Sequence, residues 1–459
     1  MGFRRLPSVL VILLSGLVVA GLATASAVAR PAAPRSPWRV VSFGRVTLRI
    51  PATWPVYNLA RQPAVCPRLD RHAAYLGKPG PDPACPAAGV GGKTEAVQIL
   101  PASAASPDLR TASTRSVVGS LTALTNQDAA ITHTIIDVLP AAGIEVSISY
   151  GTDPALARSI QASITVRPAS KAAAGAAAAG GAVALRPAAL PAIPAQGIYQ
   201  GPGFDACTAP SAKVMSRWLA SPYRAVGVYI GGVNRACAQA NLTANWLATI
   251  RRAGWHYFPF YVGLQASCVE ASGDAEIVPS KAAAEGRAAA TDAATAARSL
   301  GIPARTPLIY DMEAYGGCGK EVITFLSAWD AGLHAEGYAA GIYESFTNIG
   351  DLVAAEGSMT EPDIIHYADW DGKATTTSSY MPSTLWTNHQ RLHQYLGGHN
   401  QAWGGATINI DADQLNANLG GKPGAAPTPA PTPTPVPVPT PTYSPPPPPF
   451  PFPYPYPPG

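Results

Sequence analysis

Charged residues are scarce in this chain. Only 13% of its 459 residues are Asp, Glu, Lys or Arg, and the formal net charge is +4. Proteins that bind nucleic acid carry clustered basic residues that neutralise phosphates, and the sequence has no such basic stripe. We therefore exclude nucleic acid as a partner.

Long apolar runs are absent after the N-terminus. Residues 1–29 carry two arginines, then an apolar run at 9–22, then small-residue cleavage sites such as that at 25–27. This pattern is typical of a secretory signal peptide, because the apolar core is too short to span a membrane. No later stretch approaches about 20 uninterrupted apolar residues. We expect an exported protein with no membrane span once residues 1–29 are removed.

Cysteines are few, and none forms the C-x-x-C pair that is common in metal sites. In an exported chain, an even number of cysteines favours disulfides. We expect Cys66 to pair with Cys85. The remaining four can pair in three ways, of which the simplest joins neighbours along the chain: Cys207 with Cys237 and Cys268 with Cys318. A metal site is the alternative, but the eight histidines show no ligand spacing, so we expect no metal and no cofactor.

Proline and glycine are abundant, with 48 and 43 residues, which indicates folded parts joined by unstructured ones. Residues 38–168 contain alternating apolar and polar stretches, for example at 46–50, and predict a small β-rich α+β domain. Residues 169–195 are almost wholly Ala, Gly and Pro, which predicts a linker. Residues 422–459 are rich in proline and predict a disordered tail.

Residues 196–421 alternate short apolar strands with helical stretches. Eight strands can be assigned, the first at 203–205 and the last at 407–410, with clear helices at 282–300 and 321–334. This alternation predicts an α/β fold, a (β/α)8 barrel of the TIM type.

Acidic residues end several of these strands, which is where barrel enzymes place their chemistry. Asp311 and Glu313 share one face of the fourth strand, because side chains alternate along a strand. Other acids end the first, sixth and last strands: Asp205, Asp369, Asp371, Asp411 and Asp413. Clustered acids raise one another's pKa, which suits a proton donor for glycosidic bond cleavage. Capping of the following helix is the alternative role for each aspartate.

Five strand-end motifs resemble, in order, those of glycoside hydrolase family 25, the lysozyme-type muramidases. They are Gly203-Phe204-Asp205, Leu308-Ile309-Tyr310-Asp311-Met312-Glu313, Gly341-Ile342-Tyr343, Leu392-His393-Gln394-Tyr395 and Ile410-Asp411. The sequence is more similar still to a glycoside-hydrolase-like family of unknown function from secreted actinobacterial envelope proteins. The resemblance covers the second domain only.

The resemblance implies a role for each matching residue. Glu313 corresponds to the general acid, and Asp311 and Asp205 to carboxylates that orient substrate or stabilise positive charge. Asp411 corresponds to the last-strand acid. We expect substrate contacts from a further set: Gln394, Tyr395, Tyr343, Asp369 and Trp370.

The sequence also departs from the muramidases. His393 and the stretch 366–368 stand where those enzymes carry tryptophan, so the surface on which a sugar stacks is altered. Trp370, Trp386 and Trp403 are candidates to restore it. We expect a secreted, wall-associated glycoside hydrolase acting on peptidoglycan or another envelope polysaccharide. The alternative is a catalytically weak protein that binds wall glycan in the same cleft. No Gly-x-Ser-x-Gly or zinc-protease motif supports a peptidase.

Overall fold

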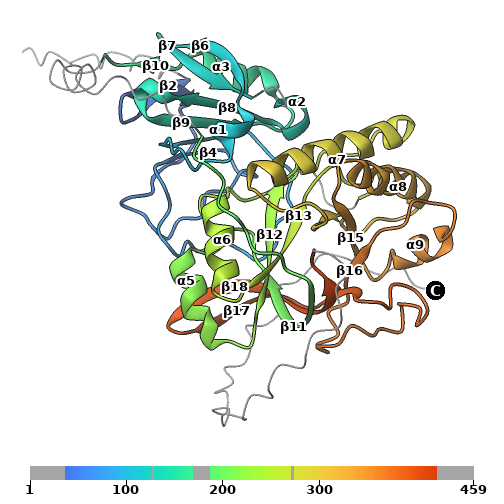
Figure 1. Ribbon diagram of the computed structural model, residues 1–459. Coiled ribbons are helices and arrows are strands. Elements are labelled where there is room, and N and C mark those ends of the chain that lie inside the picture. Colours follow the sequence, from blue (N-terminus) through green and yellow to red (C-terminus); the bar gives the residue numbers. More distant parts are fainter. Residues whose placement is uncertain (1–36, 127–128, 169–186, 270–272, 421–459) are drawn as a thin grey trace, which may run out of the picture.

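The computed structural model describes residues 37–126, 129–168, 187–269 and 273–420 (Figure 1). The predicted signal peptide, most of the predicted linker and the predicted Pro-rich tail lie outside the described residues. None of the helices in the described ranges has both the length and the apolar character needed to cross a membrane.

The N-terminal half is built from two sheets and a few short helices. The smaller sheet has the order β1-β2-β10, with β1 at Trp38–Phe43, β2 at Val46–Pro51 and β10 at Thr165–Val166. The larger has the order β3-β4-β5-β9-β8-β7-β6. Its strands are β3 (Val56–Asn58), β4 (Ala73–Leu76), β5 (Ala96–Pro101), β6 (Thr114–Val118), β7 (Leu121–Thr125), β8 (Thr134–Leu139) and β9 (Ile144–Ser149). The helices are α1 (Asp108–Thr111), α2 (Ala129–Thr132), the 3-10 turn η1 (Pro140–Ala142) and α3 (Pro154–Ala162).

Strand β2 shows why this part of the chain forms sheets. Val46, Leu48 and Ile50 are buried in the core between the sheets and α3, whereas Thr47 and Arg49 lie on the other face. A period of two places alternate side chains on opposite faces of a sheet, so only one face needs to be apolar. This is the alternation that the sequence predicts for this strand.

The C-terminal half is a closed barrel of eight strands in the order β11 to β18. The strands are β11 (Ile198–Asp205), β12 (Ala225–Gly231), β13 (His256–Tyr261), β14 (Pro307–Asp311), β15 (Ala339–Ser345), β16 (Ile364–Ala368), β17 (Gln390–Trp403) and β18 (Ala406–Asn418). The helices are α5 (Ala212–Arg217), α6 (Ala244–Arg252), α7 (Ala282–Ser299), α8 (Gly319–Ala335) and α9 (Ile349–Ala355), with 3-10 turns η2 (Trp218–Ala220) and η3 (Pro279–Lys281). The predicted eight-stranded barrel is confirmed in strand number and closure.

The last strand departs from a regular (β/α)8 barrel, which the structure does not confirm. Strands β11 to β17 run parallel to their neighbours, but β18 pairs antiparallel with both β17 and β11. No helix stands between β17 and β18, because Gly404 and Gly405 make a two-residue turn with φ of 58° and 76°. Consecutive left-handed residues form the turn that suits a twisted hairpin. The chain therefore folds straight back on itself here.

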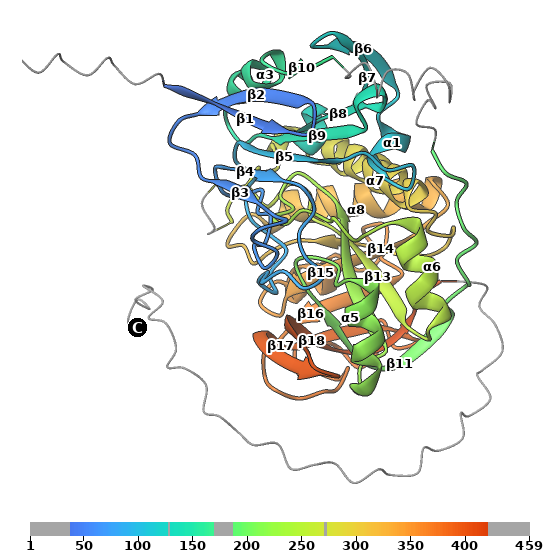
Figure 2. The same cartoon turned by 90° about the vertical axis from the view of Figure 1, so that its left-hand side faces the viewer.

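Helix α7 lies between the N-terminal sheets and the barrel (Figures 1 and 2). It also packs closely on α8, because small residues meet at the crossing. A Cβ on Gly286 would stand 2.3 Å from the Phe325 carbonyl oxygen, and one on Gly332 would stand 2.7 Å from Ala290 Cβ. The backbones can approach only because these positions lack a side chain.

The six cysteines form three disulfides, Cys66–Cys85, Cys207–Cys237 and Cys268–Cys318. Of the three pairings that the sequence leaves open for the barrel, the structure contains the one between neighbours along the chain. The second bridge joins the loops that follow β11 and β12, and the third joins those that follow β13 and β14. Both stiffen the rim at the C-terminal ends of the strands.

Candidate active site

Three aspartates lie side by side where β11 meets β18. Asp205, the last residue of β11, is directly opposite Asp411 in the antiparallel register, and Gly203 is opposite Asp413. Asp205 and Asp413 are 0% exposed and Asp411 is 6% exposed. Directly opposed residues hold their Cβ atoms about 5 Å apart, so these carboxyl groups are close neighbours. The hairpin of β17 and β18 is what brings the last strand, and its acids, beside the first.

Asp311 is the last residue of β14, and Glu313 follows in the loop, outside the strand to which the sequence assigned it. Asp311 is 3% exposed, whereas Glu313 is only partly buried and reaches the opening. Gln265, fully buried in the loop after β13, holds the chain here: its Nε2 donates to the Asp311 carbonyl at 2.9 Å, and its Oε1 accepts from the Glu313 amide at 2.8 Å. The backbone of both acids is thereby fixed by one amide side chain.

Burial and mutual repulsion raise the pKa of each of these acids. Burial, followed by the charges of Asp274 and Asp205, raises the pKa of Glu313 to about 7. The pKa of Asp411 rises to about 9 by burial and by the charges of Asp205 and Asp413. Burial and the charge of Glu313 raise the pKa of Asp311 well above its usual range. The four acids predicted from the sequence thus form one electrostatically coupled group.

Asp205 differs from its neighbours because two side chains donate to it. Burial and the charge of Asp413 raise its pKa to about 7. The Tyr229 hydroxyl donates to Oδ1 at 2.7 Å and Gln394 Nε2 donates to Oδ2 at 3.0 Å, and both bonds favour the ionised form. Asp205 is therefore the best prepared of the buried aspartates to carry a negative charge.

Gln394 links Asp205 to the open surface. Its Oε1 accepts from the Tyr343 hydroxyl at 3.1 Å and from Trp370 Nε1 at 3.0 Å. Trp370 is 63% exposed, and its ring lies over Gly397, where a Cβ would stand 2.6 Å away. The structure therefore brings Gln394, Tyr343 and Trp370 together at the site and presents an indole face to solvent.

Two predicted contact residues lie differently. Tyr395 follows Gln394 along the strand and hydrogen-bonds to Tyr223, which packs in the core outside the barrel. Asp369 bonds through its backbone, because its carbonyl accepts from His393 Nε2 at 2.8 Å and its amide donates to the Gln394 carbonyl at 3.1 Å. Neither is joined to the acid group by a side-chain hydrogen bond in the described part of the chain.

The structure adds residues to which the sequence analysis gave no role in the site. Asp413 forms a pair with His366, with His366 Nε2 3.0 Å from Asp413 Oδ1 and both side chains fully buried. Burial lowers the pKa of His366 to about 3 and raises that of Asp413 well above its usual range, so burial favours the neutral form of both groups. The two-residue spacing from Asp411 was a usable signal for Asp413.

Asp274 is the other addition, from the loop between β13 and α7. It is the first charge, after burial, that raises the pKa of Glu313. Its own pKa is raised to about 6 by burial, against a hydrogen bond from the Gly92 amide that lowers it. No sequence pattern points to Asp274, because it lies in a loop far along the chain from Glu313.

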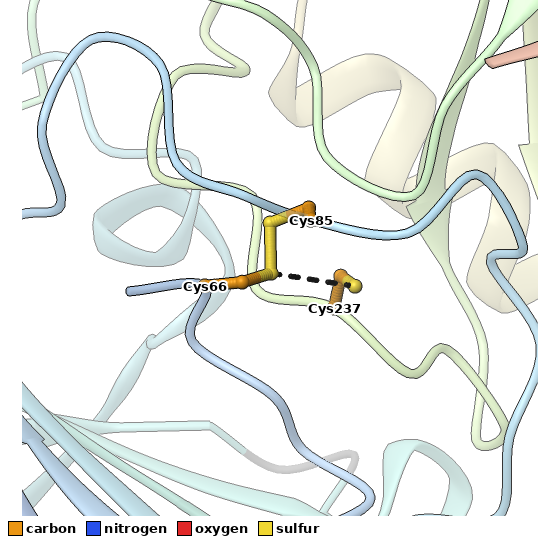
Figure 3. A group of neighbouring side chains, drawn as sticks. All are labelled: Cys66, Cys85 and Cys237. Carbon is orange, nitrogen blue, oxygen red and sulfur yellow. Dashed lines mark hydrogen bonds between the residues drawn. A yellow bond between two sulfur atoms is a disulfide. The ribbon is translucent and has the colours of Figure 1, made fainter. Parts of the chain in front are cut away.

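The described residues contain one cluster with the crowding of a metal site, formed by Cys66, Cys85 and Cys237 (Figure 3). Its sulfur atoms belong to disulfides, and Cys66 Sγ contacts Cys237 Sγ at 3.9 Å. A disulfide sulfur is no thiolate ligand, so the chemistry of this donor set does not fit a metal.

The barrel resembles several solved structures at low identity. The bacterial lysozyme from Streptomyces coelicolor is 18% identical, with 48% of this chain and 93% of that chain covered and a TM-score of 0.33. A family 25 glycosyl hydrolase from Bacillus anthracis is 12% identical, with 48% and 90% covered and a TM-score of 0.31. A muramidase from Acremonium alcalophilum is 14% identical, with 48% and 94% covered and a TM-score of 0.31.

No curated protein matches this chain. A family model does match, over residues 216–415, and is described as Rv2525c-like, glycoside hydrolase-like domain. The matched segment includes Glu313, Asp311, Gln394 and Asp411, whereas Asp205 precedes it. Residues 216–415, which form most of the barrel, therefore match the model of the Rv2525c-like, glycoside hydrolase-like domain.

Proposed function

We propose that this protein is a secreted glycoside hydrolase of the cell envelope that cleaves peptidoglycan or a related wall polysaccharide, with Glu313 as general acid. The observation that carries the proposal is the coupled acid group at the barrel mouth, in which the most accessible member has a pKa of about 7. A general acid works best when its pKa lies near the working pH. The family of the barrel is consistent with this chemistry.

The proton step belongs to Glu313. At neutral pH about half of the Glu313 side chains are protonated, since the pKa is about 7. A protonated Glu313 gives its proton to the glycosidic oxygen while the bond from that oxygen to the anomeric carbon breaks, with both electrons leaving on the oxygen. The leaving sugar departs as an alcohol, and the Glu313 carboxylate can then accept a proton from the attacking water.

The positive charge that develops on the sugar ring needs a negative neighbour. Asp205 fits this role because Tyr229 and Gln394 both donate to it and favour its ionised form. Asp411, with a pKa of about 9, is largely neutral at pH 7 and suits hydrogen bonding to sugar hydroxyls. Trp370 offers the apolar face on which a sugar ring stacks.

One observation favours a second candidate, a wall-binding protein with little or no turnover. Four of the acids, Asp205, Asp311, Asp411 and Asp413, are at most 6% exposed, so a substrate cannot reach them without displacing the groups that cover them. Trp370 and Glu313 at the opening would still bind a glycan. This role needs no proton transfer.

Comparing the protein with its Glu313→Gln variant tests the proposal. Gln has the shape of Glu but cannot deliver a proton, so we expect release of reducing ends from purified peptidoglycan to fall about 100- to 10,000-fold. Binding to the same walls, measured by co-sedimentation, should change little, and the melting temperature should match the wild type. Equal turnover by both proteins would contradict the role of Glu313. Binding by both with turnover by neither would favour the wall-binding function.

A further inference from the structure

A segment of the N-terminal half, residues 86–92, lies on the mouth of the barrel. We call it the mouth segment. Its backbone forms hydrogen bonds to barrel loops along its whole length. Pro86 O accepts from Cys207 N at 3.3 Å, Ala87 N donates to Asn409 Oδ1 at 2.8 Å, Gly89 O accepts from Ala236 N at 2.9 Å and Gly91 N donates to Asn234 O at 3.0 Å. At its end, Gly92 N donates to the Asp274 carboxylate.

These partners occupy one continuous part of the rim. Asn409 belongs to β18, Cys207 follows β11, Asn234 and Ala236 follow β12, and Asp274 follows β13. Because β18 is hydrogen-bonded to β11, these four strands are consecutive around the barrel. Glu313 and Trp370 lie on the other part of the rim, after β14 and β16. The mouth segment therefore covers the side of the mouth formed by β18, β11, β12 and β13, whereas Glu313 and the exposed Trp370 lie on the other side.

The mouth segment lies directly on the site. A Cβ on Gly89 would stand 2.3 Å from the ring of Tyr229, whose hydroxyl donates to Asp205. A Cβ on Gly92 would stand 1.9 Å from the Gly273 carbonyl oxygen. Val90 packs against the apolar cluster inside the barrel that includes Tyr229 and Tyr343. No space for a sugar ring separates Gly89 from Tyr229, since less than the room for a methyl group is left.

The mouth segment is held in place at both ends. Before it, the Cys66–Cys85 disulfide contacts the Cys207–Cys237 disulfide of the barrel rim, with Cys66 Sγ 3.9 Å from Cys237 Sγ (Figure 3). After it, the buried Lys93 Nζ donates to the Gly232 carbonyl at 3.1 Å. The N-terminal loops, blue in Figure 2, accordingly lie against the barrel. These contacts hold the mouth segment in a fixed position on the barrel.

We propose that the mouth segment closes one end of the glycan cleft, so that this protein engages the end of a glycan chain and not its interior. The inference rests on the proposed function of the barrel as a glycan site. A chain bound through an internal sugar must leave the site in two directions. Here one direction is blocked by Gly89 and Val90, and a chain that enters over Trp370 must stop there. Gly89 and Val90 are thus specificity-determining residues supplied by the N-terminal half.

Binding of end-blocked oligosaccharides tests this inference without requiring turnover. The probes are linear peptidoglycan oligosaccharides carrying a bulky fluorophore at the reducing end, at the non-reducing end, or on a peptide in the middle. They are titrated against the full-length protein carrying Glu313→Gln. We expect a fluorophore at one of the two ends to weaken binding by about tenfold or more, because the fluorophore collides with the mouth segment. A fluorophore at the opposite end should leave the affinity nearly unchanged. Equal affinity for both end-labelled probes, or no binding of any probe, would overturn the inference.

A matched pair of variants tests whether the mouth segment causes this discrimination. Val90→Ala shortens the side chain at the blocked end and should relax the discrimination between the two end-labelled probes by several-fold. Val117→Ala removes the same methyl groups from the exposed strand β6 and should leave the discrimination unchanged. Equal effects of the two substitutions would contradict the role of the mouth segment.

The product pattern separates this inference from the proposed function. If the wild type cleaves glycan strands, short products should accumulate while the mean length of the remaining strands changes slowly. Rapid shortening of the strands would establish hydrolysis but overturn the chain-end inference. Absence of turnover, with one-sided exclusion of the end-labelled probes, would refute hydrolysis and leave the chain-end inference supported.

Discussion

Replacing Asp274 by Asn should make Glu313 a stronger acid. Asp274 has a pKa of about 6 and is therefore mostly ionised at pH 7. Its negative charge is the largest influence after burial on the pKa of Glu313, which stands at about 7 instead of the usual 4.5. Since burial is the larger cause, loss of the Asp274 charge accounts for less than half of that difference. We expect the pKa of Glu313 to fall by about one, or about 1.4 kcal/mol.

The expected consequence depends on pH. With a pKa of about 7, roughly half of Glu313 is protonated at pH 7, and with a pKa near 6 only about a tenth is protonated. The rate at pH 7 should therefore fall about fivefold, while the rate at pH 5 should change little, because Glu313 is protonated there in both proteins. The alkaline limb of the pH–rate profile measures this directly. Titration of the Glu313 carboxyl by ¹³C NMR gives the same quantity in the absence of turnover.

Glu276→Gln is the control for this prediction. Glu276 lies two residues away in the same loop, and its charge raises the pKa of Asp274. It is not among the charges that act on Glu313. Glu276→Gln should leave the alkaline limb nearly in place. If Asp274→Asn leaves the alkaline limb of the pH–rate profile in place, or moves it to higher pH, the electrostatic coupling between Asp274 and Glu313 is refuted.

Three further predictions follow from the same structure. The melting temperature should fall from pH 5 to pH 8, because Asp205, Asp411 and Asp413 have raised pKa values in the fold and hold protons that the unfolded chain releases above about pH 4. Asp411→Asn should reduce the pH dependence of the free energy of unfolding by up to about 1.4 kcal/mol per pH unit, and an unchanged dependence would argue against the raised pKa of Asp411. Trp370→Ala should weaken glycan binding by about tenfold in a calorimetric titration without lowering the melting temperature, since the ring is 63% exposed, and a large loss of stability would assign it a packing role instead. Thiol titration of the unfolded, unreduced protein should find almost no free sulfhydryl, as all six cysteines are paired, and four or more thiols per chain would contradict the three disulfides.

The sequence alone predicted an eight-stranded barrel with acids at its rim. Short apolar runs separated by helical stretches specify strands and helices locally, and the apolar run at 307–310 leads directly into Asp311. Since parallel strands of a barrel all end at one rim, acids that end those strands must meet there. For the same reason, Asp205 and Asp311 could be assigned to one site without coordinates, whereas Asp411 lies at this rim because β18 runs antiparallel and begins there.

Other features were decided only by the tertiary structure. The direction of β18 depends on the turn at Gly404 and Gly405. Counting strands in the sequence does not reveal whether the last one runs parallel or antiparallel. The role of Gln394 as the link between Asp205 and Trp370 requires side chains from β11, β17 and the loop after β16 to converge. Neither arrangement has a signature within a short window of sequence.

The largest difference concerns the N-terminal half. From the sequence it is a separate β-rich unit, because its periodicity and its cysteines can be satisfied internally. In the structure, the Gly-rich stretch 89–92 lies on Tyr229 and bonds to Asp274, residues well over 100 positions away in the chain. Glycines specify little by themselves, and their use here depends on the surface that they approach. Local sequence patterns therefore determined the barrel and its acids, and only the packing of the two halves decided how much of the mouth remains open.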